Sequence, residues 1–278
     1  MPDAGIDGRL ARRRFERAAG SYAKASRIEA EIGARMLERL DYIKLIPRRV
    51  LDACSGPPQR VLGRRYPGAE VIAVDFSHAM LRIGKKRLFE RKPPRAVCGD
   101  FARLPFGAGA IDLVWSNMAL HWAADPLAAL REFHRVLAVD GLLMFSTLGP
   151  DTLAELRAAA GGARVHAFAD MHDLGDMLVA AGFAEPVMDM ERVTLVYADG
   201  AALLADLRAS GQTNALAARA GVPARGLSGR RFLASLHERL AAQRREGKLP
   251  VSYEVVYGHA WKAAPKHSAD GRSIVRFS

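Results

Sequence analysis

Val71-Ile72-Ala73-Val74-Asp75 is an apolar run that ends in a carboxylate, and runs of this form decide the fold class of the chain. Val50-Leu51-Asp52 has the same form, and two further apolar runs lead into Asp100 and Asn117. Short apolar runs bounded by turn residues are typical of strands buried on both faces. Helical patterns alternate with these runs between residues 50 and 147. The alternation predicts an α/β fold with a mostly parallel, Rossmann-like, doubly wound sheet.

The polar residues at the strand ends predict where a ligand binds. In an open parallel sheet, ligands lie outside the carboxyl ends of the strands, where these ends meet in one crevice. Asp75 stands roughly 20 residues after Asp52, a spacing that suits an acceptor for ribose hydroxyls. Each aspartate taken singly could instead be the N-cap of the helix that follows it. Together and in this order, the acids favour a nucleoside-binding site.

Periodicity also predicts the domain organisation. Residues 1–45 are expected to form an N-terminal helical lid, and residues 46–198 the core that binds the cofactor. Residues 199–250 are predicted to be a basic helical insertion, which at a sheet edge commonly carries specificity. Residues 251–278 hold the last strand, which completes seven strands, and the tail. The predicted elements are strands 50–52, 71–75, 96–98, 111–116, 141–147, 187–197 and 251–263, and helices within 11–40 and at 59–65, 78–90, 126–137, 151–160 and 170–181.

Composition narrows the class of protein. The chain has 278 residues, of which 50% are hydrophobic and 26% charged, as in globular proteins. Its two cysteines, Cys54 and Cys98, lie apart without a Cys-x-x-Cys pattern, so we expect reduced thiols in the cytoplasm rather than a disulfide framework or a zinc site. No apolar run approaches the roughly 20 residues that span a bilayer, which predicts no membrane segment and no signal peptide.

The formal net charge of +11 favours an anionic partner without identifying it. Arginines crowd the N-terminal helices and the segment from Arg219 to Lys248, although a solvated helical face is the simpler interpretation for any one of them. The interpretation that the protein is a nucleic-acid methyltransferase is supported by the charge alone. Residues 117–120, Asn-Met-Ala-Leu, do not form the Asn/Asp-Pro-Pro-aromatic stretch of amino-directed enzymes, and no cysteine is placed for C5 chemistry. We therefore expect no nucleic-acid partner and no metal.

The strand-end acids and the loop after the first strand resemble those of class I S-adenosylmethionine-dependent methyltransferases. These enzymes need an acid for the ribose, and an acceptor with apolar walls for adenine. The resemblance places Asp75 at the ribose and Phe76 and Met80 at the wall of the adenine site. Asp100 is expected to accept the adenine amino group, with Phe101 covering the ring.

The loop itself departs from the family pattern Asp-x-Gly-x-Gly-x-Gly. Here it is Asp52-Ala53-Cys54-Ser55-Gly56-Pro57-Pro58, in which only the middle glycine is kept. Proline fixes φ and removes an N–H donor, whereas glycine allows positive φ and close approach of a ligand. Asp52, Cys54 and Gly56 are predicted to face the methionine end of the cofactor, and Asn117 and Leu120 to lie under its sulfonium. A catalytically weak or inactive assembly or binding partner remains the alternative function.

An NAD-binding Rossmann domain also places an acid about 20 residues past its glycines. It would leave Asp100 and the loop at 104–106 without a role, so methyl transfer is favoured.

Further motifs narrow the resemblance and cover nearly the whole chain. They are FERAA at 15–19 with Tyr22, SNMALHW at 116–122, FSTLGPDTL at 145–153 with ELR at 155–157, DMHDLGD at 170–176 and VVYGHAW at 255–261. In these motifs the chain resembles the malonyl-acyl-carrier-protein O-methyltransferases of biotin synthesis. A related branch of respiratory complex I assembly factors shares several of them. The resemblance implies methylation of the free carboxylate of malonyl-acyl-carrier protein, so that chain elongation toward pimelate can begin.

Such a transfer needs no general base, because the carboxylate is already ionised, but it does need orientation. Arg157 is predicted to orient the carboxylate, with Tyr22 as a second donor and His172 in the same pocket. The alternative for Arg157 is a helix residue that faces solvent. The alternative for His172 is that Asp170 or Asp173 caps a helix and His172 packs beneath it. The basic insertion is expected to dock the acidic carrier protein.

Overall fold

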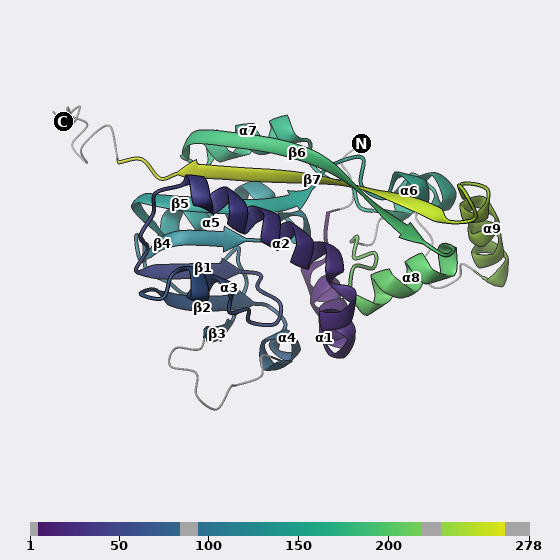
Figure 1. Cartoon of the computed structure of the whole chain (residues 1–278), viewed down its shortest axis with the longest axis horizontal. Helices are drawn as coiled ribbons and strands as arrows, with labels where there is room; N and C mark the ends of the chain where they lie inside the picture. The colour runs from purple at the N-terminus through teal and green to yellow at the C-terminus, as the bar shows by residue number, and fades with distance from the viewer. Residues whose placement is uncertain (1–4, 84–93, 218–228, 265–278) are drawn as a thin grey trace.

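The computed structural model describes residues 5–83, 94–217 and 229–264, and its centre is one seven-stranded sheet (Figure 1). The strand order is β3-β2-β1-β4-β5-β7-β6, in which β7 runs antiparallel to both of its neighbours and the other contacts are parallel. The strands are β1 (Arg49–Ala53), β2 (Glu70–Asp75), β3 (Arg95–Cys98), β4 (Ile111–Ser116), β5 (Leu137–Leu148), β6 (Ala184–Tyr197) and β7 (Leu249–Trp261). The predicted fold and its strands are confirmed.

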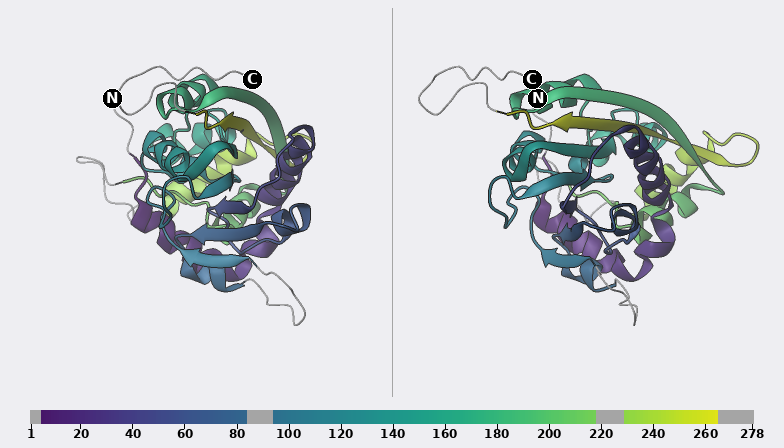
Figure 2. Two further views of the ribbon diagram at one scale, coloured as in Figure 1. Left: turned by 90° about the vertical axis from the view of Figure 1, so that its left-hand side faces the viewer. Right: turned by 60° about the vertical axis from the view of Figure 1, so that its left-hand side comes forward.

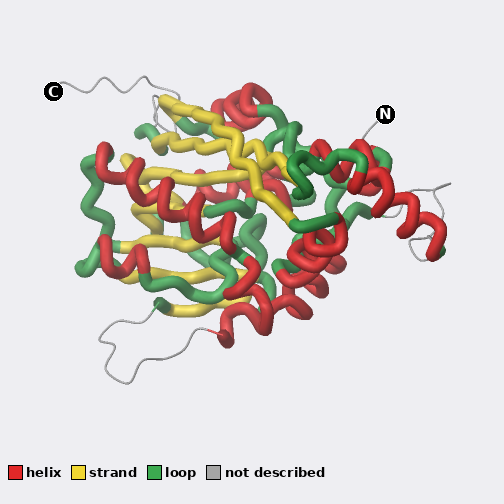
Figure 3. Tube along the Cα trace, turned by 45° about the vertical axis from the view of Figure 1, so that its right-hand side comes forward, coloured by secondary structure: helices red, strands yellow, loops and turns green. Residues whose placement is uncertain are grey.

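Helices cover both faces of the sheet and gather at one end of it (Figure 3). They are α1 (Gly8–Ala25), α2 (Arg27–Arg39), α3 (Val61–Arg65), α4 (His78–Ile83), α5 (Pro126–Val136), α6 (Ala154–Ala160), α7 (Met171–Ala180), α8 (Gly200–Ala209) and α9 (Arg230–Ala241), with short 3-10 turns η1 (Leu40–Tyr42), η2 (Leu120–Trp122) and η3 (Gly162–Arg164). None of the described helices is both long and apolar enough to cross a membrane.

Alternating strand residues build the two hydrophobic layers. Val50, Leu113 and Leu142 face one side of the sheet, in the same buried cluster as Ile32 and Met36 of α2. The following residue of each strand, Leu51, Val114 and Leu143, faces the other side, in a cluster with Leu130 and Phe133 of α5. Because successive strand side chains point to opposite faces, one run of apolar residues serves both layers.

Two predicted elements differ from the structure, and a third is described only in part. The helix expected at 151–160 begins only at Ala154, because Leu153 is left-handed with φ of 56°. The predicted strand 141–147 begins at Leu137, and its pairing with β4 is irregular where Asp140 takes a φ of 60°. The predicted helix 78–90 is described as far as Ile83, and its remainder lies outside the described residues.

The insertion was predicted as helical throughout, and this is wrong for residues 210–217. After α8 the chain leaves helical geometry and pairs with the N-terminal segment, where the Asp7 amide donates to the Ala215 carbonyl at 2.8 Å. Helix α9 follows after a segment that holds Arg219 and Arg225, both of which lie outside the described residues.

The last two strands extend past the rest of the sheet. Strand β7 pairs with β5 only from Trp261 to Val255, but continues beside β6 until Leu249 meets Tyr197. The β6–β7 pair therefore forms an arm beyond β5, and α8 and α9 lie at its end (Figures 1 and 2).

Candidate cofactor cleft and adjoining chamber

A cleft lies at the carboxyl ends of the parallel strands, beneath α1. Strand ends contribute acids, small residues and apolar side chains to it, and the N-terminal helices contribute aromatic rings and an acid. We call this site the cofactor cleft, and its lining residues are Phe15, Tyr22, Glu29, Cys54, Gly56, Asp75, Phe76, Met80, Phe101, Asn117, Met118, Ala119, Trp122 and Gln212.

The loop after β1 keeps a sharp left-handed turn despite its altered sequence. Cys54 and Gly56 both have φ of 59°. A Cβ on Gly56 would lie 3.4 Å from the Tyr22 ring, so both conformation and space favour glycine there. The Ser55 amide donates to the Val74 carbonyl at 3.1 Å, and the Gly56 amide to Asp75 Oδ2 at 2.9 Å. Cys54 occupies a conformation that costs an ordinary residue about 1–2 kcal/mol, so the departure from glycine is accommodated at the expense of stability.

Asp75 is the buried acid at the centre of the cleft. Its Oδ1 accepts from the Ser77 amide at 2.7 Å while Oδ2 accepts from Gly56. Each oxygen keeps acceptor capacity for a ligand hydroxyl, because a carboxylate has about four lone-pair sites. Burial raises the pKa of Asp75 to about 6, against the lowering effect of the two amides.

Asp52 lies below Asp75 and does not line the cleft. Burial, and then the negative charge of Asp75, raise the pKa of Asp52 to about 7. The two acids give the floor of the cleft a negative potential when they are ionised.

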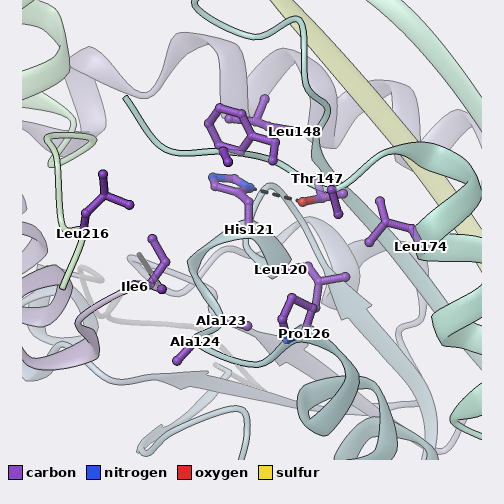
Figure 4. A pocket seen from close by; sticks show the side chains of 14 residues that line it. Ile6, Leu120, His121, Ala123, Ala124, Pro126, Thr147, Leu148, Leu174 and Leu216 are labelled. Carbon is purple, nitrogen blue, oxygen red and sulfur yellow. Dashed lines mark hydrogen bonds between the residues drawn. The ribbon is translucent and has the colours of Figure 1, made fainter. Parts of the chain in front are cut away.

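The other predicted cofactor residues divide between the cleft and its surroundings. Phe76, Met80 and Phe101 form apolar walls next to Asp75. Asp100 is exposed and does not line the cleft, because its Oδ1 caps a tight turn by accepting from the Ala102 amide at 2.9 Å. Leu120 lines a separate cavity of about 170 Å³ beside His121 and Thr147 (Figure 4).

The cleft also contains the predicted Asn117 and two polar residues that the sequence analysis missed, Glu29 and Gln212. The Asn117 side chain donates to the Glu29 carbonyl at 2.8 Å and accepts from Ser146, which fixes α2 to the ends of β4 and β5. Glu29 is 7% exposed, and its Oε1 accepts from Gln212. Its Oε2 has no hydrogen-bond partner within the part of the chain that the structure describes. Burial raises the pKa of Glu29 to about 7, and this acid lines the cleft with one carboxyl oxygen that has no partner among the described residues.

A larger space adjoins the cofactor cleft and shares Trp122 and Gln212 with it. This chamber measures about 470 Å³ and is walled mainly by apolar side chains. Its lining residues are Arg14, His121, Trp122, Leu148, Leu153, Leu156, Ala160, Arg164, Val165, His166, Phe168, Leu204, Leu207, Arg208, Gln212, Thr213, Asn214, Phe232 and Leu236. Burial and the neighbouring His166 lower the pKa of His121 to about 3, so His121 is neutral. Among the described lining residues the permanent charges are therefore positive, from arginine.

The structure separates the three residues predicted to act on the substrate. Tyr22 lies over Gly56 in the cofactor cleft, where burial, and then the charge of Glu29, raise its pKa far above the ordinary value. Arg157 donates to the Thr152 carbonyl at 3.3 Å and lines neither the cleft nor the chamber. His172 is exposed and contacts Asp170 at 2.8 Å, while the Asp170 side chain caps α7. Of the three, the geometry brings only Tyr22 to the site.

Comparison with known proteins identifies the family. Residues 51–145 match a methyltransferase domain. A malonyl-[acyl-carrier protein] O-methyltransferase of Gallionella capsiferriformans is 49% identical, over 98% of this chain and 97% of its own. The chain belongs to the malonyl-acyl-carrier-protein O-methyltransferase family. A further member, from Laribacter hongkongensis, is 47% identical over 95% of this chain and 93% of its own.

Solved structures agree with this family in fold. A Bacillus halodurans methyltransferase has a TM-score of 0.59 at 17% identity, covering 83% of this chain and 98% of that one. A phosphoethanolamine N-methyltransferase of Haemonchus contortus, solved with S-adenosyl-L-methionine, has a TM-score of 0.53 at 16% identity, covering 83% of this chain and 53% of that one. The predicted methyltransferase class and its cofactor, S-adenosylmethionine, are confirmed by family membership and the matched domain, and the NAD-binding alternative is set aside.

Proposed function

We propose that this protein transfers a methyl group from S-adenosylmethionine to the free carboxylate of malonyl-acyl-carrier protein, which starts the synthesis of the pimeloyl chain of biotin. One observation carries the proposal beyond family membership. A chamber of about 470 Å³ with apolar walls and cationic side chains adjoins the cofactor cleft and shares Trp122 and Gln212 with it. Apolar walls suit the acyl and pantetheine stem, and the arginines suit a carboxylate.

The residues of the cofactor cleft fit S-adenosylmethionine chemically. Asp75 has acceptor capacity for ribose hydroxyls, and Gly56 leaves space that a Cβ would fill. Glu29 offers an unpaired carboxyl oxygen to the ammonium group of the methionine part. Phe15, Phe76 and Trp122 meet across the cleft at 5.0 to 5.8 Å between ring centroids and leave about 40 Å³ free, so these rings must part to admit the cofactor. We infer that α1, which carries Phe15 and Tyr22, serves as the lid.

The chain's own contribution to the reaction is positioning and exclusion of water. Asp75, Gly56 and Glu29 would hold S-adenosylmethionine, which would supply a methyl group on a sulfonium sulfur to the carboxylate oxygen and would leave as the uncharged thioether. A carboxylate is already ionised near neutral pH, so no side chain has to remove a proton. Orientation and desolvation therefore account for the acceleration.

The carrier protein is proposed to dock at the end of the β6–β7 arm. Arg164 and Arg208 line the chamber, and Arg230 and Arg231 are exposed at the start of α9. Exposed cations attract an acidic partner and raise the rate of encounter. We keep a cytoplasmic location as a prediction, which rests on the unpaired thiols of Cys54 and Cys98.

The test is methyl transfer from labelled S-adenosylmethionine to purified carrier protein. Malonyl-carrier protein is compared with acetyl-carrier protein, which has the same thioester but no carboxylate. Label on the malonyl form alone, released by mild base as expected for a methyl ester, supports the proposal. Absence of transfer by a protein that still binds S-adenosylhomocysteine would instead favour a non-catalytic partner.

A further inference from the structure

Two residues that line the chamber each carry a buried polar atom that has no hydrogen-bond partner within the described residues. These atoms are Arg14 Nε on α1 and Thr213 Oγ1 in the segment after α8. Buried polar groups in proteins are nearly always paired, and each unpaired one costs about 1–3 kcal/mol. Two such atoms on residues that line one cavity indicate a ligand that pairs with both.

Packing brings together the two segments that carry these residues. A Cβ on Gly211 would lie 3.3 Å from the Phe15 Cα and 3.2 Å from the Ala18 Cβ, so α1 contacts the backbone of the segment after α8. Ser21 Oγ donates to the Ala209 carbonyl at 2.7 Å, which fixes the same contact one turn further along. Gly211 has φ of 78°, which turns the chain away from α8 and toward the chamber. Arg14 and Thr213 therefore come from two segments that are tightly packed together.

The same residues stand at the junction with the cofactor cleft. Phe15, next to Arg14, lines the cleft and meets the Trp122 ring edge-on at 5.0 Å. Gln212, next to Thr213, lines both the cleft and the chamber. A group held by Arg14 and Thr213 therefore lies beside the opening through which the acyl chain must reach the methyl group.

Resting on the proposed function, we propose that Arg14 and Thr213 form the binding site for the substrate's malonyl carboxylate. The guanidinium of Arg14 donates N–H groups and carries the opposite charge, and the Thr213 hydroxyl donates a further hydrogen bond. The other charged groups of the described lining are Arg164, which stacks on Phe232 at 4.1 Å, and the exposed Arg208. No acid among the described lining residues opposes an anion there.

This assignment gives the role of orienting cation to Arg14 of α1, where the sequence analysis predicts Arg157 of α6. Arg157, the cation that the sequence favours, is engaged with the Thr152 carbonyl outside the chamber. Arg14 is also suited to release of product, because methylation converts the carboxylate into an uncharged ester that no longer pairs with a guanidinium.

The experiment measures equilibrium binding of malonyl- and acetyl-carrier protein to the full chain saturated with S-adenosylhomocysteine, in which no turnover occurs. We expect the parent to prefer the malonyl form at least tenfold, as a charged hydrogen bond implies. Arg14→Met should remove most of this preference, and Thr213→Val should reduce it about two- to tenfold. Arg13→Met, an exposed position on the same helix, is the matched control and should leave it unchanged.

The outcomes separate this inference from the proposed function. Affinity for S-adenosylhomocysteine that stays at the parent value in all variants shows that the fold and the cleft are intact. A parent without malonyl preference, or an unchanged preference in both Arg14→Met and Thr213→Val, would overturn the carboxylate site even if methyl transfer is observed. Loss of S-adenosylhomocysteine affinity in Arg14→Met would assign Arg14 to the cofactor and overturn it as well. If Arg14→Met does not fold, Thr213→Val decides alone.

Discussion

The cofactor cleft and the chamber differ in how the chain builds them. Asp75, Phe76 and Phe101 follow strands of the parallel sheet, so sheet topology alone brings them together. The chamber takes its walls from α1, η2, α6, α8 and α9, which are far apart in the sequence. A strand-end site can therefore be inferred from local pattern, whereas a site made by helix packing depends on contacts that no short motif encodes.

The two regions also differ in charge. Asp52, Asp75 and Glu29 make the cofactor side acidic, while Arg14, Arg164 and Arg208 make the chamber basic. A cationic cofactor and an anionic substrate are thus attracted from opposite sides to a shared junction. We expect this difference in charge to favour the cofactor on one side and the anionic substrate on the other.

The variant with the largest expected effect should impair binding in the cofactor cleft and leave the chamber unchanged. Asp75→Ala removes the ribose acceptor and leaves the Gly56 and Ser77 amides without their partner, so we expect S-adenosylhomocysteine affinity to fall by about 1–3 kcal/mol, roughly 5- to 150-fold. Isothermal calorimetry measures this. Asp100→Ala is the control, because this exposed strand-end acid does not line the cleft. Equal affinity in Asp75→Ala and the parent would show that the ribose lies elsewhere.

A second pair of substitutions should weaken binding of the carrier protein on the chamber side and leave cofactor binding unchanged. Arg230→Glu with Arg231→Glu reverses two exposed charges on α9, and we expect the KM for malonyl-carrier protein to rise about three- to tenfold at low salt. The effect should shrink above physiological ionic strength, where screening acts within about 8 Å. Arg244 is left unchanged because it donates to the Ala198 carbonyl at 2.9 Å.

The control for this charge reversal is Arg131→Glu with Arg82→Glu, two exposed positions on other helices. If these changes raise KM equally, the long-range field of the whole protein, and not a docking surface on α9, attracts the carrier.

The acidity of the cleft predicts a dependence of stability on pH. Burial, and then Asp75, raise the pKa of Asp52 to about 7 in the folded protein, above its unfolded value near 4. Protonated Asp52 therefore contributes to the unfolding free energy in full below pH 4, and this contribution is lost as pH rises through 7. In Asp52→Asn, the drop in unfolding free energy between pH 5 and pH 8 should be smaller by about 1–3 kcal/mol. Urea denaturation at the two pH values measures this, and an identical drop would show that Asp52 is not protonated in the folded state.

The smallest expected effect concerns the altered loop. Cys54→Gly should relieve the left-handed strain at residue 54 and raise the unfolding free energy by about 1 kcal/mol. Adding Pro58→Gly restores an amide and is expected to strengthen S-adenosylhomocysteine binding and raise methyl-ester formation. Thermal denaturation and calorimetry of the parent, Cys54→Gly and the double variant separate the two effects. A lower melting temperature for Cys54→Gly would mean that the buried thiol stabilises more than its backbone costs.

Sequence reasoning succeeded where the side chain and the element that positions it are neighbours along the chain. Asp75, Phe76 and Met80 lie at or shortly after the end of one strand, so a correctly predicted strand places all three in the cleft, and their role with the cofactor stays a prediction. It failed for Arg157 and His172, because orientation on a helix depends on which face packs inward. The same reasoning could not find four other residues, because contacts between segments distant in sequence bring them to the cleft and the chamber. They are Glu29, Gln212, Arg14 and Thr213.

The β6–β7 arm determines how the segment that carries α8 and α9 is joined to the sheet. Tyr197 and Leu249 face each other in the sheet, so the intervening segment leaves and rejoins the arm at a single paired step. A segment of another length or sequence can be grafted there while the parallel strands and their acids stay in register. The α8 and α9 part of the chamber wall can therefore be replaced separately from the strands that carry Asp52 and Asp75.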